Sequence, residues 1–141
     1  MRTLTSKTTR DFPARLEQVG RVRRFAREMT AGHPCADDVI LVVSELAANA
    51  IEHCGQRDCG RIAVQLAHLD DVVQIDVRDG GGAGMPQLRH AGEDATTGRG
   101  LFLVDSLALT WGSSRDESGT HVWCTISCSC HGSSMAGPAA A

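Results

Sequence analysis

The chain has few aromatic residues and almost no lysine. Aromatic side chains make up 4% of its 141 residues, tyrosine is absent, and Lys7 is the only lysine. Proteins that bind single-stranded nucleic acid stack the bases on aromatic side chains, and their domains are usually basic. This chain instead carries a formal net charge of −3. We therefore do not expect it to bind nucleic acid directly.

The scarcity of lysine also excludes two common phosphate-binding motifs. No Gly-x-x-x-x-Gly-Lys precedes a helix, which excludes a Walker-type loop, and the strand lysine of ordinary protein kinases has no counterpart. A Gly-x-Ser-x-Gly nucleophile elbow is absent as well. Any phosphate site in this chain must therefore use other residues.

Long apolar runs are missing too. The longest, such as residues 39–43, are far shorter than the roughly 20 residues of a membrane-spanning helix. The first seven residues are polar and do not resemble a signal peptide. We therefore expect no membrane contact and a cytoplasmic location. Because cytosolic thiols stay reduced, we interpret the six cysteines as free thiols.

A chain of 141 residues is the size of one domain, so we expect a single domain over residues 1–127, followed by a disordered tail of small residues over 128–141. Runs of strands with hairpins between them imply helices packed on one face of a sheet. The predicted fold is an α+β two-layer sandwich with a mixed, mostly antiparallel sheet. Strands are expected over about residues 3–12, 62–66, 73–77, 109–112 and 121–127, and helices over 14–30, from 37 to about 53, and over 101–108.

Two polar residues on the second predicted helix are candidates for phosphate chemistry. Glu45 and Asn49 are four residues apart, so they lie one turn apart on the same helix face. The oxygen of an asparagine amide suits Mg²⁺, which takes few protein ligands and completes its shell with phosphate and water. Glu45 could accept the proton of a hydroxyl or water that attacks the terminal phosphate.

Two glycine clusters follow this helix. Asp79 ends a predicted strand and precedes glycines 80–82, so its carboxylate could accept a hydrogen bond from an exocyclic amine and select adenine over guanine. Gly98 and Gly100 flank a helix start, where free N–H groups favour phosphate, and Arg99 adds positive charge. Each cluster taken alone could be an ordinary turn.

In this order the motifs resemble the Bergerat-fold ATPases, the family shared by gyrase and sensor histidine kinases, and most closely the small anti-sigma-factor serine kinases. Residues 43–53 resemble the asparagine box, which implies that Asn49 binds Mg²⁺ and Glu45 is the base. Residues 79–82 and 97–104 resemble the two glycine boxes, although Ala83 stands where the first box usually has its second glycine. The nucleotide-binding residues that the resemblance implies are Asn49, Asp79, Gly81, Gly98, Arg99, Gly100, Leu101 and Thr120.

The resemblance implies an ATP- and Mg²⁺-dependent serine/threonine protein kinase. Its partners would be a sigma factor and the antagonist protein that it phosphorylates, and it could form a homodimer. Residues 1–32 carry eight lysines and arginines against three acids, so the basic first helix is a candidate docking face. One alternative is a switch that binds ATP without turnover and has no need of Glu45. Another is an α+β structural domain without nucleotide affinity.

Overall fold

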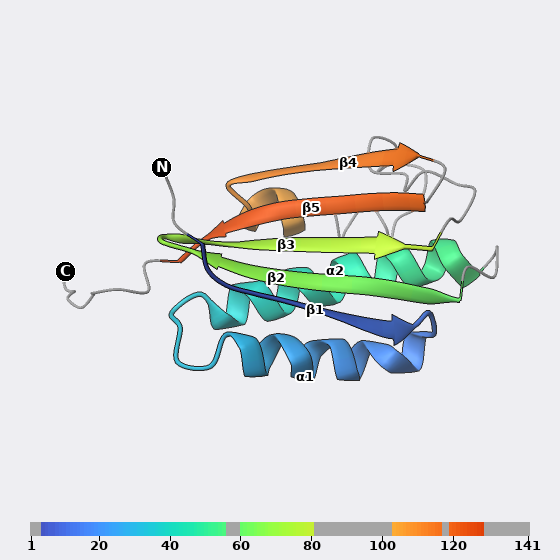
Figure 1. Cartoon of the computed structure of the whole chain (residues 1–141), viewed down its shortest axis with the longest axis horizontal. Coiled ribbons are helices and arrows are strands. Elements are labelled where there is room, and N and C mark those ends of the chain that lie inside the picture. Colours follow the sequence, from blue (N-terminus) through green and yellow to red (C-terminus); the bar gives the residue numbers. More distant parts are fainter. Residues whose placement is uncertain (1–3, 56–59, 81–102, 117–118, 129–141) are drawn as a thin grey trace.

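A five-stranded antiparallel sheet with two long helices on one face forms the body of the computed structural model (Figure 1). The structure describes residues 4–55, 60–80, 103–116 and 119–128. The strands lie in the order β1-β2-β3-β5-β4. Their bounds are β1 Leu4–Pro13, β2 Arg61–Leu69, β3 Val72–Asp79, β4 Thr110–Asp116 and β5 Gly119–Ser127, and those of the helices are η1 Leu16–Gln18, α1 Val19–Met29 and α2 Ala36–Gly55.

The α+β class expected from the sequence is confirmed, and each of the four described strand pairings is antiparallel. Some boundaries differ. The strand β1 runs through Pro13 instead of ending before it, which an edge strand tolerates because proline lacks only a hydrogen-bond donor. The first helix begins at Val19, after the short 3₁₀ turn η1. The strand β4 is longer than the predicted 109–112, and residues 103–107 form a short helix.

The core fills the layer between the sheet and α2. The apolar stripe of α2 faces alternate residues of the central strands, as the period of 3.6 on a helix and of 2 on a strand requires. Asp37 and Asp38 lie in the first turn of α2, where negative charge complements the helix dipole. The buried apolar residues of α2 are Val39, Val42, Val43, Leu46, Ala47, Ala50 and Ile51, and they face Val64, Leu66, Ile75 and Val77 of β2 and β3.

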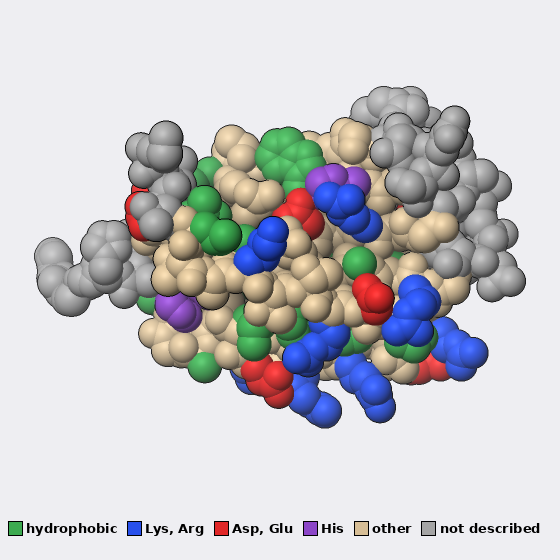
Figure 2. All heavy atoms as spheres, in the orientation of Figure 1, with side chains coloured by type: hydrophobic (Ala, Val, Ile, Leu, Met, Phe, Trp, Pro, Cys, Tyr) green, Lys and Arg blue, Asp and Glu red, His purple; other side chains and the backbone are tan. Residues whose placement is uncertain are grey.

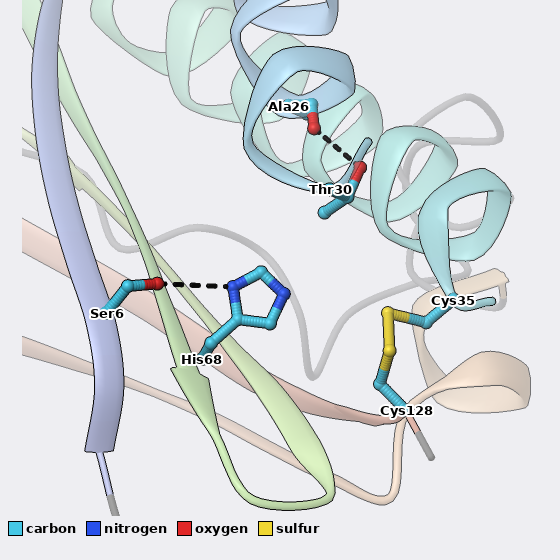
Figure 3. The surroundings of a disulfide bond; sticks show 6 residues. All are labelled: Ser6, Ala26, Thr30, Cys35, His68 and Cys128. Atoms are coloured by element: carbon cyan, nitrogen blue, oxygen red, sulfur yellow. Dashed lines mark hydrogen bonds between the residues drawn. A yellow bond between two sulfur atoms is a disulfide. The ribbon is translucent and has the colours of Figure 1, made fainter. Parts of the chain in front are cut away.

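A disulfide joins the loop before α2 to the end of β5 (Figure 3). It links Cys35 to Cys128, whose Cα atoms are 5.1 Å apart. The expectation of free thiols is therefore wrong for this pair. The two residues are 93 positions apart, so only the folded chain brings them together. Cys124 is free and buried, and burial, with a smaller contribution from the charge of Asp76, raises the pKa of its thiol to about 12. A thiol with so high a pKa is a poor nucleophile.

Replacing Cys35 and Cys128 together by alanine is expected to lower the free energy of unfolding by about 2–5 kcal/mol, because the bond restricts the unfolded chain. Denaturant unfolding measures this change. Reductant should lower the unfolding midpoint of the wild-type chain to that of the double variant and leave the variant itself unchanged. A wild-type midpoint that does not respond to reductant would contradict the pairing.

Candidate functional site

A small cavity lies between the second half of α2 and the neighbouring ends of β3 and β5. Its volume is about 10 Å³, which is the space for about one water molecule. Apolar side chains form most of its wall, and the polar groups come from one amide, one carboxylate and one hydroxyl residue. The lining residues are Leu46, Asn49, Ala50, Val77, Asp79, Thr120 and Val122. Three residues predicted from the sequence, on three different elements, thus meet at one place.

The carboxylate of Asp79 connects the end of β3 to the start of β5. Its Oδ1 accepts a hydrogen bond of 3.1 Å from the backbone N–H of Thr120. Only 6% of the Asp79 surface and 3% of the Thr120 surface are exposed. The residue before Thr120 is Gly119, whose φ of 135° is unfavourable for a residue with a side chain. Gly119 therefore lets the chain enter β5 at the point where Thr120 meets Asp79.

The side chain of Asn49 enters the cavity from α2. It is 7% exposed, and its Nδ2 atom has no hydrogen-bond partner in the described part of the chain. A buried donor without a partner costs about 1–3 kcal/mol, so a ligand or a water would be stabilised here. Half a turn about the last side-chain bond presents the oxygen instead of the nitrogen. The carboxamide therefore fits Mg²⁺, which binds oxygen ligands.

Glu45 is half-buried on α2, one turn before Asn49, and is not among the residues that line the cavity. Its neighbour Ser44 makes a contact that sequence reasoning missed. Ser44 Oγ donates a 2.6 Å hydrogen bond to the carbonyl oxygen of Ile40, and Arg23 Nε of α1 donates one of 3.3 Å to Ser44 Oγ. One arginine of the basic helix thus links α1 to α2 beside Glu45. In the sequence, nothing in the spacing of the basic residues distinguishes Arg23 from the other arginines of this helix.

The remaining predicted site residues, Gly81, Gly98, Arg99, Gly100 and Leu101, lie outside the described residues. Their assignment to the phosphates stays a prediction. The cavity described above contains the residues that the sequence analysis assigned to the metal and the purine, Asn49, Asp79 and Thr120.

A buried carboxylate on the other face of β3 was not identified from the sequence. Asp76 is 4% exposed although it lies on the face of the sheet that the two long helices leave uncovered. Its Oδ1 is 2.6 Å from Nε2 of His121, the residue after Thr120. Its Oδ2 accepts hydrogen bonds from Gln65 Nε2 at 3.4 Å and Gln74 Nε2 at 3.2 Å. These contacts connect β2, β3 and β5 directly behind the cavity. The one sequence signal that could have indicated these contacts is the presence of Asp76 in a strand with several apolar residues.

A larger cavity of about 540 Å³ lies at the opposite end of the sheet and includes none of the predicted site residues. The rings of His33 and His68 stack there with their centroids 4.2 Å apart. Figure 3 shows His68 turning one ring nitrogen toward Ser6, whose Oγ is 3.5 Å from Nδ1. Burial, and to a smaller extent the neighbouring His33, lowers the pKa of His68. Because size alone does not indicate chemistry, the candidate site is the smaller cavity around Asn49, Asp79 and Thr120.

The comparison with family models identifies residues 12–126 as a histidine kinase-like ATPase domain. The match covers most of the chain, so the chain belongs to the family of histidine kinase-like ATPase domains. A comparison with curated proteins finds no match. Family membership supports ATP binding and a role as an ATP-using kinase or regulator. None of the helices that the structure describes is long and apolar enough to cross a bilayer.

Asp79→Asn is expected to weaken ATP binding by about tenfold to a hundredfold, the usual effect of losing a hydrogen bond to a charged group. The amide nitrogen that replaces one carboxylate oxygen would face another donor, either the Thr120 N–H or the adenine amine. Calorimetric titration with ATP and Mg²⁺ measures the affinity. The same change at Asp38, which is exposed in the first turn of α2, is the matched control. Equal affinity in the Asp79 variant and the wild-type chain would contradict the assignment.

Proposed function

We propose that the chain is an ATP-dependent serine/threonine protein kinase of the anti-sigma type, which binds a sigma factor and phosphorylates an antagonist protein. The observation that carries the proposal is the meeting of Asn49, Asp79 and Thr120 around one cavity. Glu45 precedes Asn49 by one helical turn. Family membership supports ATP binding. The kinase activity, the roles of the residues and the partners are what we propose in addition.

At the purine end, the lining residues have the chemistry that an adenine ring requires, although the cavity of about 10 Å³ must widen to admit the ring. The side chains of Leu46, Val77 and Val122 are apolar and can pack against the faces of a flat ring. Asp79 is an acceptor at the edge of this space, where adenine presents an amine and guanine presents a carbonyl oxygen. The wild-type chain should therefore prefer ATP to GTP. The backbone of Thr120 holds the carboxylate in position.

At the phosphate end, the oxygen of the Asn49 carboxamide would bind Mg²⁺. Bound Mg²⁺ would neutralise charge on the phosphate oxygens. Glu45 would then accept the proton of the attacking serine or threonine hydroxyl, since a carboxylate one turn away on the same helix face can reach a substrate held next to Asn49. The half-buried position of Glu45 leaves it accessible to a hydroxyl that comes from outside the chain.

The main alternative is a regulatory module that holds ATP and changes a binding surface without phosphate transfer. Both functions require Asp79 and Asn49, so nucleotide affinity does not separate them. They differ at Glu45, which only the kinase needs. The presence of a carboxylate at this position favours the kinase.

The partner would dock on the exposed arginines of α1. Arg21, Arg24 and Arg27 are exposed, and their charge suits an acidic protein surface. Arg23 is not a suitable test residue, because its hydrogen bond to Ser44 links α1 to α2. Reversing the charge of Arg27 should weaken the affinity for a sigma factor or antagonist protein, measured by surface plasmon resonance. An unchanged affinity would exclude this face.

Glu45→Ala is expected to lower phosphate transfer by about 10²–10⁴-fold, the usual contribution of a general base, and to leave ATP affinity nearly unchanged. Transfer of label from γ-labelled ATP to an added antagonist protein measures the main activity. The slow hydrolysis of ATP by water needs no partner and should fall in parallel, because the attacking water also loses a proton. Calorimetry on the same preparation measures the affinity for ATP.

Glu52→Ala is the matched control, since Glu52 is an exposed glutamate two turns further along α2. It should retain both activities. If the Glu45 variant transferred phosphate at the rate of the control, Glu45 would not be the base. If the wild-type chain bound ATP but showed neither transfer nor hydrolysis, the regulatory module would be the better description.

A further inference from the structure

A groove rich in arginine lies between the end of β1 and the helix α1, outside the site described above. Its volume is about 430 Å³. Figure 2 shows lysine and arginine side chains gathered along the lower edge of the molecule, where β1 and α1 run in Figure 1. The lining residues are Arg10, Asp11, Phe12, Pro13, Gln18, Arg21, Arg24, Phe25, Glu28 and Arg61. None of these residues lines the Asn49 cavity.

The charge of the groove matches a doubly negative ligand. Four arginines and two acidic residues line it, which leaves a net formal charge of +2. A phosphate monoester carries about −1.5 to −2 at neutral pH. The arginines come from four places along the fold, namely β1, the first and second turns of α1, and the start of β2. They therefore approach a ligand from several sides, and each planar guanidinium can bind two phosphate oxygens.

One of these arginines is positioned by an aromatic ring. The guanidinium carbon of Arg10 lies 4.6 Å from the centroid of the Phe25 ring, in a cation–π contact. Phe25 is 1% exposed and packs against Phe12 with ring centroids 6.0 Å apart, so the ring is a rigid support. Arg10 Nη1 is also 4.0 Å from Glu28 Oε1, with both side chains about half exposed. Such an exposed ion pair contributes little, and a phosphate can displace Glu28 from Arg10.

The groove lies at the same end of the sheet as the Asn49 cavity. Phe12 of β1 pairs with Ile62 of β2, and Ile62 pairs with Asp79 of β3. Two steps between adjacent strands correspond to about 10 Å. A protein bound at the nucleotide site can therefore extend to the groove.

We propose that this groove binds the phosphate of a phosphorylated serine or threonine side chain on a partner protein. A concave site flanked by Asp11 and Glu28 suits one isolated dianion better than a membrane surface, whose many anionic headgroups would also face these two carboxylates. The proposal does not depend on the kinase activity, because binding at the groove requires neither ATP nor Glu45.

The test uses the full chain labelled with ¹⁵N and a short phosphoserine peptide, titrated up to about 10 mM. The peptide should shift the amide resonances of the groove residues in a saturable way. Inorganic phosphate should shift the same resonances more weakly, and the unphosphorylated peptide should shift none. Arg24→Ala and Arg61→Ala should each lower the affinity for the phosphopeptide by about tenfold or more, as expected for the loss of a charge-assisted hydrogen bond.

Arg78→Ala is the matched control, since Arg78 is an exposed arginine of β3 that neither lines the groove nor lies on the docking face of α1. It should change the affinity for the phosphopeptide less than twofold. An equal loss in the Arg24 and Arg78 variants would overturn the proposal, because it would indicate attraction by the general positive charge of the surface. Saturable binding of an aspartate peptide with equal affinity would also overturn it, as would binding of anionic vesicles that the phosphopeptide does not inhibit.

The Asp79→Asn variant separates this proposal from the proposed function. It should bind the phosphopeptide normally while losing affinity for ATP. Loss of phosphopeptide binding in that variant would place the phosphate at the nucleotide site and overturn the assignment to the groove.

Discussion

The hydrogen bond from the Thr120 backbone to the Asp79 carboxylate is the contact on which the candidate site depends. It lies where β3 ends and β5 begins. At this point the Asp79 side chain takes the place of the backbone hydrogen bond that the two strands would otherwise form. A buried carboxylate requires hydrogen-bond donors, and this backbone N–H supplies one from a rigid strand. The carboxylate is therefore held at the mouth of the cavity beside Asn49, whose amide lacks a partner in the described chain. The Asp79 carboxylate, which has a hydrogen-bond partner, and the Asn49 amide nitrogen, which has none in the described chain, then face the same cavity.

The same two strands are also connected on their other face. Asp76 precedes Asp79 by three residues, and His121 follows Thr120, so the alternation of strand side chains places the two pairs on opposite faces of the sheet. The contact between Asp76 and His121 resists sliding of β5 along β3, which would separate Thr120 from Asp79. A buried charge without its partner is costly, so the contact between Asp76 and His121 also specifies how β5 pairs with β3. The geometry of the cavity is thus determined by contacts on both faces.

The spacing of residues along the chain predicted the features that depend on local periodicity, namely the helices, the strands and the residues that share one helix face. The four-residue interval between Glu45 and Asn49 is a pattern within one helix, and the alternation of apolar residues indicated the sheet, whereas Thr120 was implied only by the family resemblance. The disulfide between Cys35 and Cys128 and the link from Arg23 to Ser44 join residues that are distant in sequence. Such contacts depend on how the helices lie on the sheet, which periodicity does not encode. The compartment argument from the N-terminus also led to the wrong expectation for Cys35 and Cys128.

The basic N-terminal segment, residues 1–32, shows how one compositional feature divides into separate roles in the folded chain. By sequence, its arginines form a single positive stretch with no internal distinction. In the structure, Arg23 is used for helix packing, Arg10, Arg21 and Arg24 join Arg61 around a groove, and Arg27 stays outside it. Positive charge held around a concave space attracts an anion more specifically than the same charge spread along a helix, because several guanidinium groups can contact one phosphate. The fold therefore converts a general electrostatic attraction, which would suit any acidic surface, into a site of defined shape near the proposed nucleotide cavity.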